Sequence, residues 1–318
     1  MKSDFVYNPQ NYSGHSHAAT IANHNGEIYL AWYAYQEKEH EEGQIVYSKY
    51  NKETGEWPKA KIAFDYLDRS SCGNPVLFSY NGKLNLLFVI LKGVYWDTAE
   101  IYHSTLDEET NQWSLADKVN TPIAMMIRHR PLVLNGKCVV PAYDEITMST
   151  VLYEFSTDPT NWTEVSRFSG EYIQGDLVAL NNLEWQMYLR AAGNNKHVMK
   201  AMSSNAGQSW AMARETPLYC PMSGIAAIIL KSSNIVVCNN HTEKHQRFPL
   251  SLSISETKGS VFEGKPWDID KSEIELSYPT MVQDDDGNIH LAYTYNRKMI
   301  KHILVSEDEI MQKCKEEV

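Results

Sequence analysis

The chain has 318 residues, of which 43% are hydrophobic, and its formal net charge is -11. The negative charge argues against nucleic acids and anionic membrane surfaces as partners. No run of about 18 apolar residues is present, so we expect no membrane-spanning helix. The chain is long enough to bury a large core, and we expect one soluble domain over residues 1–318.

The N-terminal residues, from Met1 to Asn8, lack the apolar segment of a secretory signal, although a mature chain after signal removal would look the same. The five cysteines are odd in number and form no Cys-x-x-Cys pair, so we expect reduced thiols. Both features favour a cytoplasmic location, or an extracellular one if a signal peptide has been removed. The sequence does not predict the oligomeric state.

Short turn signals recur along the chain, and each lies between two apolar runs. They come about 50 residues apart, a period typical of repeat architectures. The turns are Asn25-Gly26, Asn81-Gly82, Asn135-Gly136, Asn181-Asn182, Ser233-Asn234 and Asp286-Gly287. Asn-Gly and Asp-Gly pairs favour two-residue β-hairpins, so the sequence predicts six copies of a hairpin-containing unit.

Tryptophans keep phase with these turns in five of the copies. They are Trp57, Trp113, Trp162, Trp210 and Trp267. Each unit has room for four short strands, which make one propeller blade, and six blades close a ring without long exposed edges. We therefore predict an all-β fold, a six-bladed β-propeller of four-stranded antiparallel blades. An open solenoid or β-helix fits less well, because the units are long and their turns vary.

The two ends of the chain complete this prediction. The sixth copy ends soon after residues 303–305, before a fourth strand. We therefore expect the segment Phe5-Val6-Tyr7 to provide that strand and close the ring. Residues 306–318 form an acidic tail that we expect to be a helix-like or frayed, solvated end.

Polar side chains flank the first and second strands of the copies. In a blade, the start of strand one and the end of strand two meet on the same face, so these side chains should converge on one mouth. The candidates before strand one are His15, His17, Asn74, His129, Arg130, Asp176 and Tyr278. The candidates after strand two are Glu42, Asp97, Glu145, Arg190, Tyr295 and Arg297. Arginine forks and aromatic faces predict an acidic carbohydrate as the ligand.

Two loops resemble a known repeat motif. The segment Ser203-x-Asn205-x-Gly207-x-Ser209-Trp210 resembles the Asp-box (Ser-x-Asp-x-Gly-x-Thr-Trp) of sialidases and related BNR-repeat proteins, and Ser156-x-Asp158-x-x-x-Trp162 is a shorter version. Residues 15–22, 73–78, 130–132, 223–225 and 275–302 are similar to the sialidase-like branch of that superfamily. The resemblance spans nearly the whole chain, although many members of this branch have no assigned activity.

The resemblance implies roles for individual residues. Sialidases clamp the substrate carboxylate with three arginines, and Arg190, Arg297 and Arg130 are the matching candidates. Tyr278 resembles the tyrosine nucleophile, which suits an anomeric carbon whose neighbouring carboxylate repels an anionic nucleophile. These residues imply a retaining exo-glycosidase of sialidase type that needs no cofactor.

The resemblance also implies carboxylates in acid and base roles. Asp176 is the candidate base beside Tyr278, and Glu42 or Asp97 is the candidate general acid. The chain departs from the family in two places. His15-Ser16-His17 stands where a sialidase carries Arg-Ile-Pro, and Gln174-Gly175 stands where a Glu is expected. These departures favour a related acidic sugar over sialic acid itself.

Two other functions fit the same residues. His15, His17, His129 and Tyr278 could act as acid and base in β-elimination, which predicts a lyase for uronate-containing glycans. A propeller that binds an acidic glycan without cleaving it is the third reading. For metals, His241 and His245 have a zinc-like spacing but lie in a predicted loop, and residues 284–286 are sufficiently explained by a hairpin turn.

Overall fold

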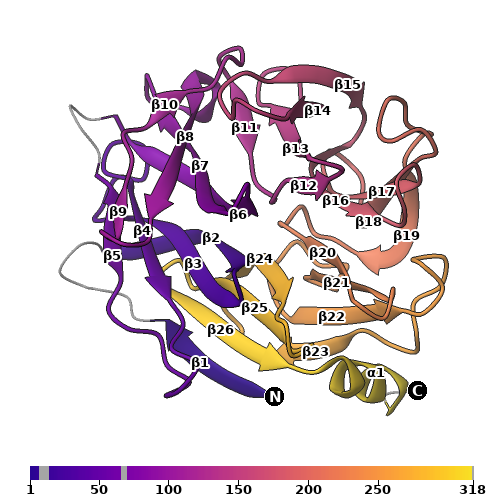
Figure 1. Cartoon of the computed structure of the whole chain (residues 1–318). Coiled ribbons are helices and arrows are strands. Elements are labelled where there is room, and N and C mark those ends of the chain that lie inside the picture. Colours follow the sequence, from indigo (N-terminus) through magenta and orange to yellow (C-terminus); the bar gives the residue numbers. More distant parts are fainter. Residues whose placement is uncertain (7–13, 66–69, 317–318) are drawn as a thin grey trace.

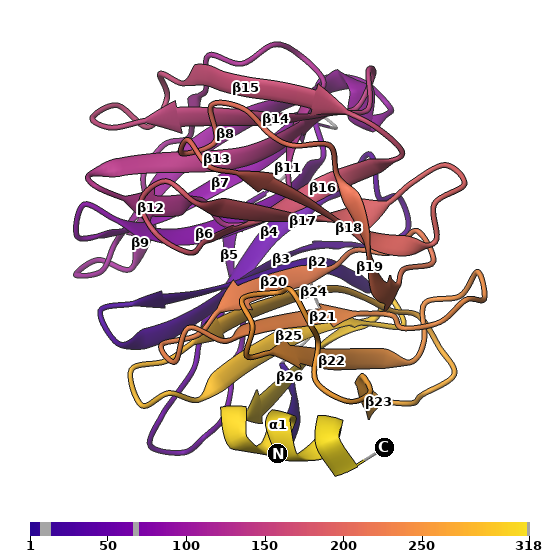
Figure 2. The ribbon, with the colours of Figure 1, turned by 90° about the vertical axis from the view of Figure 1, so that its right-hand side faces the viewer.

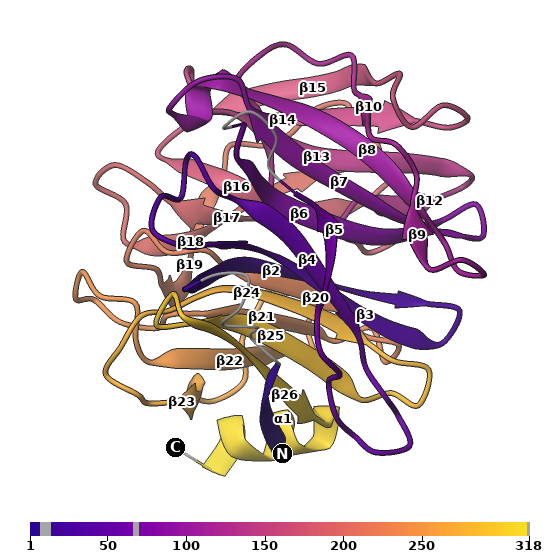
Figure 3. The same ribbon diagram turned by 90° about the vertical axis from the view of Figure 1, so that its left-hand side faces the viewer.

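Six antiparallel sheets stand around a central axis in the computed structural model, which confirms the predicted six-bladed propeller (Figure 1). The structure describes residues 1–6, 14–65 and 70–316. Seen from the sides, the sheets are twisted and stacked against one another (Figures 2 and 3). Each sheet is one blade, and its strands follow chain order from the axis outward, except in the last blade, whose outermost strand is β1 (Lys2–Val6).

The first three blades occupy the N-terminal half. Blade 1 contains β2 (His15–His24), β3 (Glu27–Tyr35), β4 (Gln44–Lys49) and β5 (Lys61–Phe64). Blade 2 contains β6 (Cys72–Tyr80), β7 (Lys83–Leu91), β8 (Ala99–Asp107), β9 (Gln112–Trp113) and β10 (Asp117–Lys118), with the 3-10 helix η1 (Trp96–Thr98) before β8. Blade 3 contains β11 (Met125–Ile127), β12 (Leu132–Leu134), β13 (Lys137–Asp144), β14 (Ser149–Phe155) and β15 (Thr163–Ser169). Its innermost strand is thus interrupted between β11 and β12, both of which pair with β13.

The other three blades complete the ring. Blade 4 contains β16 (Tyr172–Ala179), β17 (Trp185–Ala191), β18 (His197–Ser203) and β19 (Arg214–Tyr219). Blade 5 contains β20 (Ala226–Ile229), β21 (Ile235–Asn239), β22 (Leu250–Ser255) and β23 (Trp267–Asp270). Blade 6 contains β24 (Leu276–Gln283), β25 (Ile289–Tyr295), β26 (Met299–Val305) and β1 (Lys2–Val6). Each predicted turn joins the innermost strand of a blade to the next strand.

The N-terminal strand closes the ring as expected. β1 pairs antiparallel with β26, from Lys2 opposite Leu304 to Val6 opposite Ile300 (Figure 1). Val6 is buried in a cluster that also holds Ala292 of blade 6 and Trp32 of blade 1. Tyr7 lies outside the described residues. The first residues of the chain thus fill the outer position of the last blade.

The acidic tail is a packed helix rather than a solvated end. Helix α1 (Glu307–Glu316) buries Ile310 and Cys314 in the cluster under blades 5 and 6. The helix expected as one alternative for this segment is confirmed, whereas the frayed, solvated end is not, because one face of the helix is apolar and packs against the blades. α1 is short, and within the described ranges no helix is long and apolar enough to cross a membrane.

The Asp-box loop lies between β18 and β19 and is held by its own side chains. The Ser203 hydroxyl accepts the Gly207 N–H at 2.9 Å, and the Asn205 carbonyl oxygen accepts the Ser209 N–H at 3.0 Å. The segment from Ser255 to Phe262 repeats this pattern, since Ser255 accepts the Gly259 N–H at 2.9 Å. The motif does not predict the loop from Ser255 to Phe262, because Thr257 and Val261 stand there in place of the Asp and Thr of the Asp-box.

A buried carboxylate joins blade 5 to blade 6. Asp270 Oδ2 accepts hydrogen bonds from the Tyr293 hydroxyl and from Lys301 Nζ, each at 2.7 Å. Burial alone would raise the pKa of Asp270, but hydrogen bonds from Lys301, Ser272 and Tyr293 outweigh it and lower the pKa to about 2. The folded-state pKa is below the ordinary value, so this carboxylate stabilises the fold above about pH 4 and loses its contribution as the pH falls toward 2.

Asp270→Asn should lower the free energy of unfolding by about 2 kcal/mol at pH 7, because charge-assisted hydrogen bonds become weaker neutral ones. Urea unfolding at pH 7 and near pH 2 measures the effect, which should shrink at the lower pH. Asp286→Asn, at an exposed position of the last hairpin, is the control. Equal losses for both variants would show that the blade junction does not depend on this carboxylate.

Candidate active site

Four innermost strands carry the same irregularity near their starts. The strand register shifts in β2, β6, β16 and β24, and one residue with positive φ lies inside each shift. These residues are Ala18, Asn74, Gln174 and Tyr278, with φ of 50°, 42°, 54° and 52°. Such bulges redirect side chains and are common beside active sites. A bulky tyrosine in this region is strained, so the fold holds Tyr278 in a conformation that it would otherwise avoid.

A cavity of about 240 Å³ opens at this end of the axis. One part of its wall is apolar or aromatic and includes Tyr33, Trp96, Met126, Tyr143, Met148 and Met222. The other part is polar and consists of His17, Glu39, Asn74, Glu145, Gln174, Arg190, Tyr278 and Arg297. The predicted candidates His17, Asn74, Arg190, Tyr278 and Arg297 are therefore brought together, although they come from four different blades.

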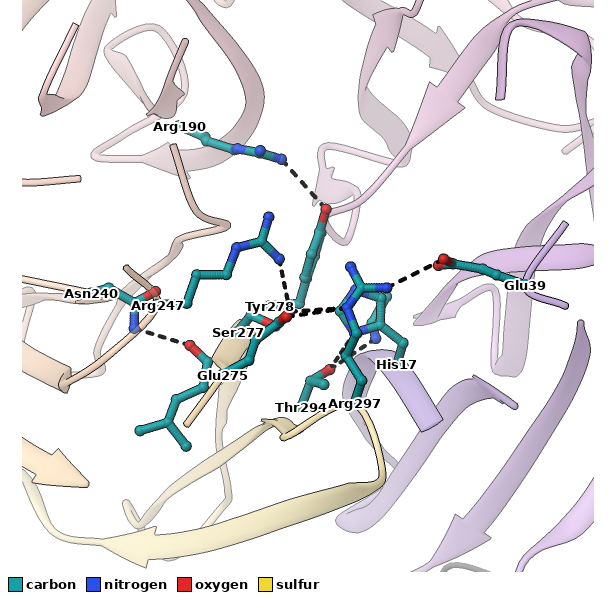
Figure 4. A network of polar contacts seen from close by, with 12 residues as sticks. His17, Glu39, Arg190, Asn240, Arg247, Glu275, Ser277, Tyr278, Thr294 and Arg297 are labelled. Carbon is teal, nitrogen blue, oxygen red and sulfur yellow. Dashed lines mark hydrogen bonds and ion pairs between the residues drawn. The ribbon is translucent and has the colours of Figure 1, made fainter. Parts of the chain in front are cut away.

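Guanidinium groups surround Tyr278 (Figure 4). Arg190 Nη1 lies 3.4 Å from its hydroxyl, and Arg128 and Arg247 lie 5.1 Å and 5.8 Å from the centre of its ring. Burial raises the pKa of the phenol, but Arg190, Arg247 and Arg128 outweigh burial and bring the pKa below its usual value. The site therefore favours loss of the Tyr278 proton.

Two glutamates neutralise part of this positive charge (Figure 4). Glu275 accepts hydrogen bonds from Arg247 Nη1 at 2.8 Å and from Arg297 Nε at 3.2 Å. Glu39 lies 3.3 Å from Arg297 Nη1 and also accepts a hydrogen bond from the Tyr33 hydroxyl. Burial raises the pKa of Glu275, but the Ser277 hydrogen bond and the two arginines outweigh it and keep this carboxyl ionised.

Arg190 differs from Arg247 and Arg297 because, among the described residues, it forms no ion pair. Its Nη1 donates to the Gln174 side-chain oxygen at 3.0 Å, and its buried Nε has no partner there. Gln174 in turn donates to the Tyr143 hydroxyl at 3.1 Å. Arg190 thus faces the cavity with donors available to an incoming anion.

His17 packs with its ring edge-on to Tyr278, with the ring centres 4.6 Å apart. Its Nδ1 is 3.1 Å from the Thr294 hydroxyl, which fixes the orientation of the ring. Burial, followed by the charges of Arg297, Arg247 and Arg128, holds the pKa of His17 well below its usual value. The imidazole is therefore neutral at physiological pH.

Asp176 and His129 lie outside the cavity wall. Both are buried, with Asp176 Oδ2 at 3.3 Å from His129 Nδ1 and at 2.8 Å from the Ala227 N–H that it accepts. Gln174, and not Asp176, is the residue of this strand that lines the cavity. The bulge explains the difference. In a regular strand residues two apart share a face, whereas the register shift between Ile173 and Asp176 interrupts that alternation. Neither the predicted base Asp176 nor the predicted ligand His129 therefore lines this cavity.

Five other candidates also lie outside the wall of this cavity. Glu42 accepts the backbone N–H groups of Glu37 and Lys38, and Asp97 is in η1. His15 contacts the Gln36 carbonyl and Lys298, and Tyr295 packs against Phe5 and Lys301. Arg130 donates to the Met281 carbonyl and lines a separate cavity. Most of these residues lie in loops or at the break in the innermost strand of blade 3. The direction of their side chains could therefore not be predicted from the alternation of a regular strand.

Several site residues were not predicted as functional. Arg247 lies in the connection between β21 and β22, and Glu275 precedes β24, where no repeat signal marks them. Glu39 lies in the charged run 37–42, where the sequence does not distinguish it from its neighbours. Glu145 was a candidate after strand two, but the sequence assigned it no catalytic role. Burial raises the pKa of Glu145; Arg190 opposes the rise, whereas Asp97 and Asp144 add to it. Within the described ranges, no cluster of three or more His, Cys, Asp or Glu residues could hold a metal ion.

The fold is a six-bladed propeller with a largely polar cavity at one end of its axis. The chain belongs to the BNR repeat-like domain family, whose model matches residues 26–291. The predicted resemblance is thereby confirmed at the level of family and fold. A search of curated protein sequences gives no match.

Solved structures support the fold at low sequence identity. A Hadza microbial sialidase, Hz136, superposes with a TM-score of 0.80 and 13% identity over 95% of this chain and 67% of that one. The NanB sialidase of Streptococcus pneumoniae gives 0.80 and 9% over 96% and 70%. A protein of unknown function from Dyadobacter fermentans gives 0.78 and 14% over 96% and 98%. At these identities the likeness extends to the fold alone.

Proposed function

We propose that this protein is a retaining exo-glycosidase that releases a terminal acidic sugar, such as a sialic acid or a related 2-keto acid sugar. One observation carries the proposal: the Tyr278 hydroxyl lies 3.4 Å from Arg190, an arginine of the cavity wall that forms no ion pair among the described residues. A tyrosine of lowered pKa and an arginine without an ion pair suit a nucleophile beside an anion site.

The charges around the cavity favour an anionic substrate. Arg247 and Arg297 share Glu275, and Glu39 provides a second carboxylate for Arg297, so Arg190 is left to bind the substrate carboxylate. A bidentate contact with a guanidinium would fix the sugar ring in one orientation. The apolar wall formed by Trp96, Met126 and Met222 would then cover a less polar part of the sugar.

In the proposed reaction the Tyr278 oxygen attacks the anomeric carbon while the bond to the leaving group breaks. Glu145 protonates the leaving oxygen and later takes a proton from the water that releases the sugar from Tyr278. Glu145 replaces Glu42 and Asp97 in this role because it lines the cavity and its pKa is raised by burial. The Tyr278 proton passes to solvent water before the attack, because cations, rather than an adjacent carboxylate, stabilise the phenolate.

If Glu145 is the general acid, kcat/KM should decrease on the alkaline side of its pH profile. Because burial raises the pKa of Glu145 in the folded protein, the protonated acid persists to higher pH than an ordinary carboxyl, and kcat/KM should fall as the pH rises through the raised pKa. Glu145→Gln should remove this decrease and slow substrates with poor leaving groups by about 100-fold, while activated aryl glycosides should lose less. Glu109→Gln, on an exposed loop, is the control. An unchanged profile in Glu145→Gln would assign the decrease to another group.

A second candidate, β-elimination from a uronate, is favoured by one observation. Neutral His17 packs against Tyr278, and Gln174 provides no basic carboxylate beside the phenol. His17 could then remove the proton next to the uronate carboxylate, with Tyr278 protonating the leaving oxygen.

Two assays on the purified protein separate these functions. Chromogenic nonulosonate glycosides report hydrolysis, and uronate polymers report elimination through the ultraviolet absorbance of the unsaturated product. Release of the chromophore alone supports the glycosidase, whereas the unsaturated product alone supports the lyase. Inactivity in both assays, together with retention on an acidic glycan array, would identify a binding protein.

A further inference from the structure

A second cavity lies at the opposite end of the propeller axis. The innermost strands run from one end to the other: His17, Asn74, Gln174 and Tyr278, near the starts of β2, β6, β16 and β24, line the first cavity. Residues near the ends of the same strands, such as Ala22, Phe78, Val178 and Val282, line the second. It has a volume of about 270 Å³.

The wall of this second cavity is mostly aliphatic. Leu77, Leu132, Leu177, Ile229 and Val282 come from five different blades. Of the described residues that line it, Arg130 is the only one with a charged side chain. The cavity therefore combines an apolar surface with a single positive charge, a composition unlike that of the first cavity.

Arg130 has donor capacity that the fold does not use. Among the described residues, its guanidinium forms one hydrogen bond, to the Met281 carbonyl, and no ion pair. Asp176 is near enough for Arg130 to lower its pKa, but burial and His129 have larger effects, and Asp176 Oδ2 already contacts His129 Nδ1 and the Ala227 N–H. Arg128, two residues earlier, uses its donors on the carbonyls of Ala19, Tyr278 and Pro279.

We propose that this second cavity binds a small carboxylate that carries a short aliphatic chain. The chain would be buried against the leucine, isoleucine and valine side chains, and the carboxylate would accept hydrogen bonds from the free donors of Arg130. Because Arg130 forms no ion pair among the described residues, an anion that accepts its remaining hydrogen bonds is the complementary ligand. This site is independent of the proposed glycosidase reaction.

Isothermal titration of the full chain with sodium hexanoate tests the proposal. Wild type should bind hexanoate, and 1-hexanol, which has the same chain without the charge, should bind at least about tenfold more weakly. Val133 is exposed and lines the cavity, so Val133→Asp should repel the carboxylate and weaken binding by about tenfold without changing the melting temperature. Val261→Asp, at an exposed position on another loop, is the matched control and should bind as wild type does.

Two further variants assign the site. Arg130→Gln should abolish hexanoate binding, whereas Arg190→Gln, which removes the donor of the first cavity, should leave it unchanged. If Arg130→Gln fails to fold, Val133→Asp still decides the question. Undetectable binding to wild type at millimolar hexanoate, equal binding to Val133→Asp, or loss of binding only in Arg190→Gln would each overturn the proposal.

Discussion

Tyr278→Phe should reduce turnover by about a thousandfold or more while leaving the protein folded, because the substitution removes only the proposed nucleophilic oxygen. The aromatic ring would keep its contacts with His17, Arg128 and Arg247. The oxygen lies 3.4 Å from Arg190, a weak contact, so the melting temperature should change little. Substrate binding should also survive, since Arg190 stays in place.

The measurements are kcat on the substrate found in the assays above and ligand affinity by titration. Tyr95→Phe, at an exposed position beside Trp96, is the matched control and should retain full activity. His17→Gln separates the two chemistries, since elimination needs its imidazole whereas the glycosidase route does not. A Tyr278→Phe variant with more than a few per cent of wild-type turnover would remove this residue from the reaction.

Val6→Asp should destabilise the whole ring by about 3–5 kcal/mol, because it places an unpaired charge in a closed apolar cluster. Val6 is 1% exposed and packs with residues of blades 1 and 6, so the substitution also loosens β1 from β26. Without β1, the backbone groups of β26 would form an unpaired sheet edge. We expect a markedly lower melting temperature and a tendency to associate.

Thermal unfolding and light scattering measure these two effects. Ser3→Asp is the matched control, because Ser3 lies on the same strand but is exposed. If Val6→Asp and Ser3→Asp melt at the same temperature as the wild type, closure of the ring does not depend on the packing of β1.

The fold could be predicted from local signals because each blade repeats them. The turn pairs adopt the conformations that their residues favour, as in Asn25-Gly26 with φ of 52° and 79°. Correct placement of the turns sets the phase of all six innermost strands. That phase also brings Tyr278, Arg190 and Arg297 to one cavity, because the residues at equivalent places in different blades face the same end of the axis.

The remaining site residues could not be found in this way because they do not follow the repeat. Arg247 and Glu275 come from connections whose course depends on tertiary packing. The choice of Asp176 over Gln174 depends on a bulge that alternation does not reveal. Arg130 was predicted at the first cavity but lines the second one, at the other end of the axis, because the innermost strand of blade 3 is interrupted next to it.

The bulge that recurs in four blades places one residue at the same position in each blade, whatever its side chain is. Ala18, Asn74, Gln174 and Tyr278 share a positive φ at equivalent places, so the same local backbone feature carries four different side chains in four blades. At Gln174, replacing the amide by a carboxylate would put a proton acceptor among groups that already contact the phenol and Arg190. Diversification of chemistry on this scaffold therefore requires single substitutions rather than remodelling of the chain.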